Sequence, residues 1–211
     1  MMPSLRIACA CLMLITAPAF SGDLFNGRDF SAWELQTTPA AAIGDVLRVL
    51  PDGVIAVSGQ PAGFFATSAS YRNYRLHVEW RWSGKAGNAG VLLHISPGPM
   101  DRVWPVSLQV QTKSGNVGDL LPMAGASFAE ALTSAPGSYP QIKARIAPDS
   151  ELALGQWNSC DVVSRDGMVE VSVNGVLQNR ITRASQQQGR VGFQLEGTAY
   201  ELRRVVLDAL D

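Results

Sequence analysis

Apolar and polar residues alternate along the middle of the chain. Between Tyr74 and Arg81 the even-numbered positions hold Tyr, Leu, Val and Trp, whereas the odd-numbered positions hold Arg, His and Glu. Successive side chains of a β-strand point to opposite faces, so this alternation predicts a strand with one buried face. The runs Gly90–Ser96 and Val106–Gln111 show the same period. We therefore expect three strands that each carry one apolar and one polar face.

The C-terminal part of the chain repeats this pattern with clear turn signals. Asp166-Gly167 and Asn174-Gly175 separate the runs Trp157–Ser164, Met168–Val173 and Val176–Ile181. Both dipeptides are typical of two-residue β-hairpin turns. Short alternating strands with almost no helical periodicity are typical of sandwiches. The chain is therefore predicted to be all-β, with two antiparallel sheets.

Three further parts of the chain complete this prediction. Residues 46–66 predict a hairpin around Pro51-Asp52-Gly53, and residues 191–196 and 199–210 predict the last two strands. We expect the N-terminal segment to be held on the sandwich by its large apolar residues, which are Phe25, Phe30 and Trp33.

Residues 113–150 differ from the rest of the chain. They are rich in Gly, Pro and small residues, and they show only weak periodicity. A long loop inside a compact domain is usually functional or mobile. We therefore expect this segment to lie over or beside the polar face of the central strands.

The N-terminus has the pattern of a secretory signal. Arg6 provides a basic start, Ile7–Thr16 an apolar run, and Ala17-Pro18-Ala19 a small-residue cleavage site. The apolar run is too short to span a bilayer. We expect residues 1–21 to be removed as a signal peptide, leaving residues 22–211 as a single periplasmic or secreted domain.

Composition, net charge and cysteine content limit the classes to which this protein can belong. Hydrophobic residues make up 46% and charged residues 17%, as in an ordinary globular protein with a core. The net charge of −1 gives no electrostatic reason to expect nucleic acid or, after signal removal, a membrane as partner. Cys9 and Cys11 precede the predicted cleavage point. The remaining Cys160 lies in an apolar strand pattern, so we expect a buried thiol without an internal disulfide.

The polar faces of the predicted strands collect titratable and amide groups. If the three central strands lie side by side, these groups converge on one sheet surface, where a residue of the last strand joins them. Glu196, next to the apolar Leu195, is either a further member or a solvated residue before the Gly197 turn. The converging residues are Glu79, Arg81, His94, Gln109, Gln111 and Arg203.

Simpler interpretations of these residues stay open. Glu79 can pair with Arg81 or with Arg203 across strands, His94 can be an ordinary strand histidine, and the amides can be plain surface groups. His77, His94 and Glu79 would offer a divalent cation suitable ligands. The sequence has no ligand-spacing motif, however, so neither a metal nor another cofactor is predicted.

A series of short segments follows one another in a specific order: LFNGRDFSAWE, YRNYRLHVEWRW, GNAGVLLH, WPVSLQVQ, GQWN, VNGV, VGFQLEG and YELRRV. In this order they resemble the 3-keto-disaccharide hydrolase family, also called DUF1080. The resemblance extends from about Asp23 to Leu210 and implies a concanavalin A-like jelly roll whose concave sheet face carries a carbohydrate site. Two positions depart from the family pattern. Gln109 stands where the family usually has Glu, and His94 stands where Arg is common.

The resemblance implies cleavage of 3-keto-glycosides. A ketone at C3 acidifies the C2 proton, because the resulting carbanion is delocalised as an enolate. The glycosidic oxygen at C1 can then leave, and addition of water gives net hydrolysis. This reaction needs a base, an acid and a group that stabilises the enolate oxygen. We expect His94 and Glu79 to be catalytic. The expected substrate-binding residues are Arg81, Gln109, Gln111, Arg203 and Glu196.

A non-catalytic carbohydrate-binding module is the main alternative. Gln109 lacks the carboxylate usual in the family, and Trp82 and Trp104 offer rings on which a sugar can stack. In both cases the partner is an oxidised or plain saccharide. A structural or partner-binding module is the third possibility. The sequence does not specify the sugar, the linkage or the oligomeric state.

The signal-peptide pattern predicts the N-terminus of the mature protein. N-terminal sequencing of protein recovered from the periplasm or the medium should give a chain that starts between Phe20 and Gly22. Exported material that still begins at Met1 would contradict the prediction.

Overall fold

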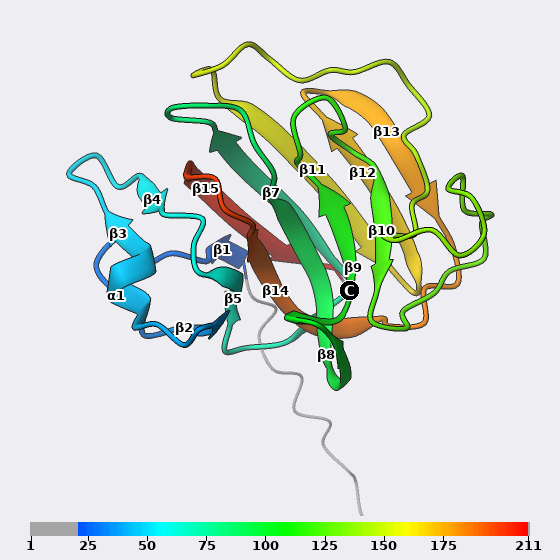
Figure 1. Cartoon of the computed structure of the whole chain (residues 1–211), viewed down its shortest axis with the longest axis horizontal. Helices are drawn as coiled ribbons and strands as arrows, with labels where there is room; N and C mark the ends of the chain where they lie inside the picture. Colours follow the sequence, from blue (N-terminus) through cyan, green and yellow to red (C-terminus); the bar gives the residue numbers. More distant parts are fainter. Residues whose placement is uncertain (1–20, 211) are drawn as a thin grey trace, which may run out of the picture.

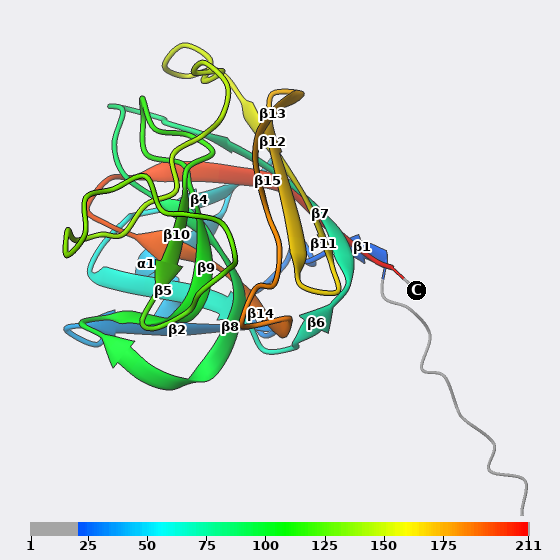
Figure 2. The same ribbon diagram turned by 90° about the vertical axis from the view of Figure 1, so that its right-hand side faces the viewer.

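The computed structural model describes residues 21–210 and consists of two antiparallel sheets packed face to face (Figure 1). Figure 2 shows the two layers from the side, with β12 and β13 in one layer and β8, β9 and β10 in the other. The predicted signal segment lies outside the described residues, except for its last position. Among residues 21–210, no helix is long and apolar enough to cross a membrane.

The first layer, which we call sheet A, has eight strands. Strand β1 (Ser21–Asp23) pairs with one end of β15. The other strands lie in the order β13 (Val176–Ile181), β12 (Met168–Val173), β11 (Asn158–Arg165), β7 (Tyr74–Arg81), β15 (Tyr200–Ala209), β4 (Ile55–Val57) and β3 (Leu47–Val49).

The second layer, sheet B, has seven strands. The short strand β6 (Tyr71–Arg72) pairs with the start of β14, and α1 (Ile43–Val46) is the only helix in the described part of the chain. The remaining strands lie in the order β10 (Leu120–Met123), β9 (Trp104–Gln111), β8 (Gly90–Asp101), β14 (Gln188–Leu195), β5 (Ala62–Thr67) and β2 (Trp33–Thr38).

This architecture confirms the predicted all-β sandwich. The two expected hairpin turns are present, because Asp166 and Gly167 have φ of 48° and 81°, and Asn174 and Gly175 have φ of 51° and 79°. Positive φ at both central positions is the signature of the type I′ turn, whose twist matches that of the flanking strands. The predicted hairpin in residues 46–66 is formed by β3 and β4.

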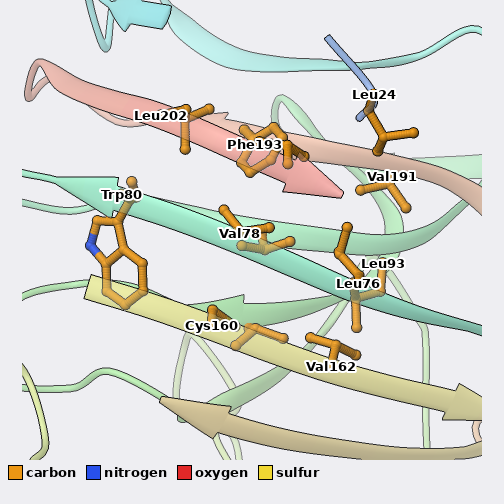
Figure 3. Close-up of a cluster of buried hydrophobic side chains, with 14 of the residues drawn as sticks. Leu24, Leu76, Val78, Trp80, Leu93, Cys160, Val162, Val191, Phe193 and Leu202 are labelled. Atoms are coloured by element: carbon orange, nitrogen blue, oxygen red, sulfur yellow. The ribbon is translucent and has the colours of Figure 1, made fainter. Parts of the chain in front are cut away.

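The core lies between the two sheets. Leu76, Val78 and Trp80 of β7 point inward from sheet A, and Leu93 and Phe193 point inward from sheet B (Figure 3). The thiol of Cys160 is buried among them, as predicted.

The aromatic residues of the N-terminal segment pack onto this core as expected. Phe25 stacks on Trp33 with 4.3 Å between ring centroids, and Phe30 meets the edge of Phe25. The ring of Trp33 in turn contacts Phe65 and Phe193 of sheet B. The segment before β2 is therefore held by aromatic contacts with the core.

Strand β8 contains a bulge that reverses its alternation. The register between β8 and β9 shifts between Leu93 and Ser96, and His94 has φ of 54°. Leu93 belongs to the core between the sheets, His94 contacts residues of sheet A, and Ile95 packs on the other side of sheet B. Two consecutive side chains therefore point inward, which is how a bulge redirects a strand.

Gly189 of β14 makes room for this bulge. A Cβ atom at position 189 would lie 2.5 Å from the carbonyl oxygen of Ile95 and would also collide with the backbone of His94. Gly189→Ala should therefore destabilise the protein by about 1–3 kcal/mol, the usual cost of forcing extra atoms into a packed interior. Chemical denaturation measures this change. Gly84→Ala is the control, since a Cβ there meets nothing within 4 Å, and it should change stability by less than about 0.5 kcal/mol. If the two variants were equally stable, Gly189 would not be needed to make room for the bulge.

Candidate functional site

The structure separates the predicted site residues into three places. Glu79, Arg81 and Arg203 lie on the outer face of sheet A, and His94 lies between the sheets. Gln109, Gln111 and Glu196 line a cleft on the outer face of sheet B. The prediction that these residues share one sheet surface is therefore wrong. Strands β7 and β8 follow each other in sequence but belong to different sheets, so their polar faces point to opposite sides of the molecule.

The residues on sheet A form an ion-pair network. Glu79 accepts hydrogen bonds from Arg203 Nε and, at 2.8 Å, from Arg204 Nη1. Burial raises the pKa of Glu79, but the hydrogen bonds from Arg203 and His77 and the positive charges of the two arginines outweigh burial, so the net pKa is lowered. A carboxylate held in this way is ionised and fully paired. The structure thus agrees with the simpler interpretation of Glu79, an ion pair across strands.

An indole ring belongs to the same network. The guanidinium groups of Arg81 and Arg203 lie 4.6 Å and 4.1 Å from the ring centroid of Trp157. Arg81 Nε also donates to Glu201 at 2.6 Å. These cation–π contacts and ion pairs cover the outer face of β7 and β15.

His94 is completely buried. Its exposed fraction is 0%, its Nε2 lies 3.0 Å from Ser164 Oγ of β11, and its ring contacts Tyr74. Burial lowers the pKa of His94 to about 4, although the backbone carbonyl of Gln186 favours the charged form. The imidazole is therefore neutral near pH 7 and has no access to a substrate. The prediction that it lies on a sheet surface was wrong because the bulge in β8 turns it inward.

The outer face of sheet B is hollowed by a cleft of about 300 Å³, which we call the sheet B cleft. Strands β9, β10 and β14 form its floor, and the segment after β9 forms one side. The segment 113–150 was expected to lie beside the polar face of the central strands. Part of it does lie beside the polar face of β9, and residues 120–123 form β10, which pairs with β9. The polar face of β7 belongs to the other sheet, so the expectation is wrong for that strand. The lining residues are Asn88, Trp104, Gln109, Gln111, Lys113, Asn116, Asp119, Leu121, Met123, Tyr139, Pro140, Ile142, Gln194 and Glu196.

Three buried amides form the polar floor of the cleft. Gln109 Nε2 donates to Gln111 Oε1 at 2.9 Å and to Gln194 Oε1 at 3.2 Å. Gly90 on the neighbouring strand β8 leaves room for this cluster, since a Cβ there would lie 2.8 Å from the Gln109 side chain. The amides are thus fixed by packing and by hydrogen bonds to one another.

Two carboxyl groups of different exposure belong to the cleft. Glu196 lies at the solvent-exposed rim, where Asn88 Nδ2 donates to its Oε2 at 2.6 Å. Partial burial of its carboxyl raises the pKa of Glu196 despite the nearby Lys113 and the Asn88 hydrogen bond. Asp119 is buried, and burial raises its pKa although the backbone N–H of Arg145 donates to its Oδ1 at 2.8 Å.

Aromatic and apolar side chains form the remaining wall. Trp104 packs with Leu121 and Met123 on the outer side of sheet B. The ring of Tyr139 is half exposed and is covered on one face by Arg102, whose guanidinium carbon lies 4.3 Å from the ring centroid. Trp82, the other tryptophan expected near a sugar, lies elsewhere: it is buried in the core and its Nε1 donates to Glu151.

Several cleft residues were not predicted from the sequence. Lys113, Asp119 and Tyr139 come from a segment without periodicity, so no local pattern indicated where they would lie. Gln194 did have a signal, because it alternates with the buried Phe193 and Leu195. In a strand whose alternate residues are apolar, such an amide belongs to the outer face.

The described residues contain no group of three or more His, Cys, Asp or Glu side chains that could hold a metal ion. The three residues that the sequence offered as possible metal ligands do not lie together. His77 and Glu79 lie on the outer face of sheet A, and His94 lies between the sheets.

Two antiparallel sheets with a hollowed outer face define a jelly roll of the kind found in glycosidases and carbohydrate-binding modules. The chain belongs to the 3-keto-alpha-glucoside-1,2-lyase-like domain family, whose model matches residues 21–207. This match confirms the resemblance noted in the sequence. A search of curated proteins found no match.

Solved structures share the fold at low sequence identity. A candidate glycosyl hydrolase from Parabacteroides distasonis has a TM-score of 0.66 and 22% identity, covering 89% of this chain and 93% of that chain. A β-glucanase from Bacillus licheniformis has a TM-score of 0.59 and 11% identity, with coverage of 93% and 100%. A carbohydrate-binding module from Bacillus subtilis has a TM-score of 0.57 and 7% identity, with coverage of 86% and 98%.

The buried His94 should make stability depend on pH. Its pKa is about 4 in the folded state, whereas the ordinary value for a solvated histidine is 6.5, so the unfolded chain binds more protons between these values. The His94 contribution is complete above pH 6.5 and is lost as the pH falls towards 4, which amounts to roughly 3 kcal/mol. Denaturation at several pH values should show this loss in the parent chain and a flatter profile in His94→Gln. If His94→Gln kept the pH dependence of stability seen in the parent chain, His94 would not be its source.

Proposed function

We propose that this chain is an exported enzyme that cleaves 3-keto-glycosides in the sheet B cleft, by elimination followed by addition of water. The observation that carries the proposal is the position of Glu196. It is the cleft carboxyl that solvent and substrate can reach, its pKa is raised, and the cation of Lys113 lies near enough to affect that pKa. The family match supports the choice of substrate class.

The proposed chemistry begins at C2 of the oxidised sugar. Glu196 removes the C2 proton, and the electron pair of the broken C–H bond forms the enolate with the C3 ketone. The enolate then expels the glycosidic oxygen from C1, which leaves a double bond between C1 and C2. The departing oxygen takes the proton back from Glu196, so the carboxyl ends the elimination ionised. Addition of water across the new double bond completes net hydrolysis.

Side chains near Glu196 can assist each part of this reaction. Asn88 orients the Glu196 carboxylate through the hydrogen bond to Oε2. Lys113 offers a positive charge to the enolate oxygen, where charge develops. The raised pKa of Glu196 brings the base closer to neutrality, the range in which a general base works best.

The roles expected from the sequence for His94 and Glu79 are replaced in this proposal. His94 has no access to a ligand, and Glu79 is occupied by two arginines on the other sheet. Glu196 changes from an expected substrate-binding residue to the proposed base. Gln109 and Gln111 keep their expected place in substrate binding.

Glu196→Gln tests the proposed base. It keeps the size and polarity of the side chain but cannot accept the C2 proton, so kcat on a 3-keto-glucoside should fall by about 100- to 10,000-fold. The matched control is Glu79→Gln, the same chemical change on the outer face of sheet A, which should keep kcat within a few-fold. In the parent chain, kcat/KM should fall with decreasing pH through a pKa that lies above the ordinary glutamate value of 4.5.

The results that would contradict the proposal are specific. Parental turnover by Glu196→Gln would exclude this carboxyl as the base. A large loss in Glu79→Gln, with stability unchanged, would move the active site to sheet A.

A non-catalytic carbohydrate-binding module is the second candidate. It is favoured by Gln109, because an amide that cannot take a proton stands where the resembled family usually has Glu. This candidate predicts that the chain binds a saccharide and leaves a 3-keto-glucoside intact. Incubation with such a substrate, followed by detection of the released sugar, separates the two functions.

A further inference from the structure

A carboxylate outside the sheet B cleft holds the loop that carries Lys113. Glu151 Oε2 accepts hydrogen bonds from Ser114 Oγ at 2.8 Å and from the backbone N–H of Gly115 at 2.9 Å. Its Oε1 accepts a hydrogen bond from Trp82 Nε1 at 2.9 Å. Trp82 is buried in the core, so Glu151 ties the loop after β9 to a fixed part of the core. Glu151 itself does not line the cleft.

The same loop pairs with the segment that carries Asn88. Residues 112–114 and 87–89 are joined by two backbone hydrogen bonds of 3.1 Å and 3.0 Å. Lys113 and Asn88 are the middle residues of these two stretches. Asn88 Nδ2 in turn donates to Glu196 Oε2 at 2.6 Å. The contacts of the loop are therefore continued, through two short backbone stretches, to the proposed base.

The charge of Lys113 is placed by its backbone alone. The side chain is exposed, and no hydrogen bond or ion pair to residues 21–210 holds its ammonium group. Burial raises the pKa of Glu196, whereas the cation of Lys113 and the hydrogen bond from Asn88 lower it. Both groups that favour the ionised carboxylate thus come from the stretches that Glu151 holds in place.

We infer that Glu151 is a positioning residue of the sheet B cleft: its carboxylate fixes residues 112–116 and, through them, keeps Lys113 and Asn88 beside Glu196. This inference rests on the proposed function for the role of Glu196. It goes further because it assigns part of the site to a carboxylate that touches no substrate and belongs to a different segment of the chain.

Two ways in which Glu151 can affect Glu196 predict opposite results. If Glu151 acts by position, its loss lets a cation and a hydrogen-bond donor move away, so the pKa of Glu196 rises. If Glu151 acted only through its own negative charge, loss of that charge would lower the pKa of Glu196. Lys113, Asp119 and Tyr139, which are the other titratable groups that line the cleft, keep their chemical identity in both cases.

Glu151→Gln tests the inference. It keeps the size of the side chain, but one oxygen becomes an NH₂ group that cannot accept a hydrogen bond, and the charge that strengthens the remaining contacts is lost. Carboxyl-carbon NMR follows the titration of Glu196, whose signal is identified by its absence from Glu196→Gln. The pKa of Glu196 should rise by roughly 0.3–1 pH unit, less than a cation in direct contact would produce.

Catalysis gives a second measurement on the same variant. On a 3-keto-glucoside, kcat should fall by about 5- to 100-fold, because displaced groups no longer meet the reacting atoms. The acid limb of kcat/KM should move to higher pH by the same amount as the pKa of Glu196. In a Lys113→Met background, Glu151→Gln should cause much less of this rise, since the cation is already absent.

Glu130→Gln is the matched control. Glu130 also holds a loop, since its carboxylate accepts hydrogen bonds from the backbone N–H and the hydroxyl of Thr182, both at 2.8 Å. It does not line the cleft, so its substitution should leave the pKa of Glu196 and kcat unchanged. Circular dichroism checks that each variant is folded. If Glu151→Gln does not fold, Ser114→Ala, which removes one of the three donors, decides the inference and should give a smaller rise.

The outcomes separate this inference from the proposed function. An unchanged or lowered pKa of Glu196 in the folded variant overturns the inference, as does an equal rise in Glu130→Gln or an undiminished rise in the Lys113→Met background. A rise confined to Glu151→Gln and Ser114→Ala supports it. If this rise is found in a chain that leaves a 3-keto-glucoside intact, the inference stands and the proposed enzyme is contradicted.

Discussion

Each sheet of this protein can bury only one of its faces against the other, and this constraint determines where function can reside. Apolar side chains such as Trp80 and Val110 occupy the space between the sheets. Their neighbours in sequence, Glu79 and Gln109, must then point outward. They point out from different sheets, so the molecule has two polar faces on opposite sides. The face of sheet A is covered by ion pairs, and the face of sheet B contains the amide-lined cleft.

The alternation of residues predicted the inward and outward positions well within each strand. Leu76, Val78 and Trp80 are buried, and Gln109 and Gln111 lie on the outer face of their sheet, as the pattern indicated. Alternation does not reveal to which sheet a strand belongs. The connection between β7 and β8 crosses from one sheet to the other, and no feature of residues 82–89 predicted that crossing. The predicted site was therefore divided between two surfaces.

The bulge in β8 escaped prediction for a different reason. The alternation rule assumes one residue per position, and His94 with φ of 54° breaks this assumption in the middle of β8. The space for it is provided by Gly189, which is distant in sequence. Lys113, Asp119 and Tyr139 were not predicted either, because a segment rich in Gly and Pro is positioned by tertiary contacts rather than by local periodicity. Long-range packing thus decides the details that matter most at the cleft.

We expect ligands to bind on the outer face of sheet B. Backbone amide hydrogen exchange with and without an α-1,2-linked glucose disaccharide tests it directly, because the two polar faces are formed by different peptides. Ligand binding on sheet B should slow exchange in residues 107–111, 119–123 and 194–196 and leave exchange in residues 77–81 and 157–161 unchanged. Protection confined to the strands around Trp157 would contradict it and place the binding site on sheet A.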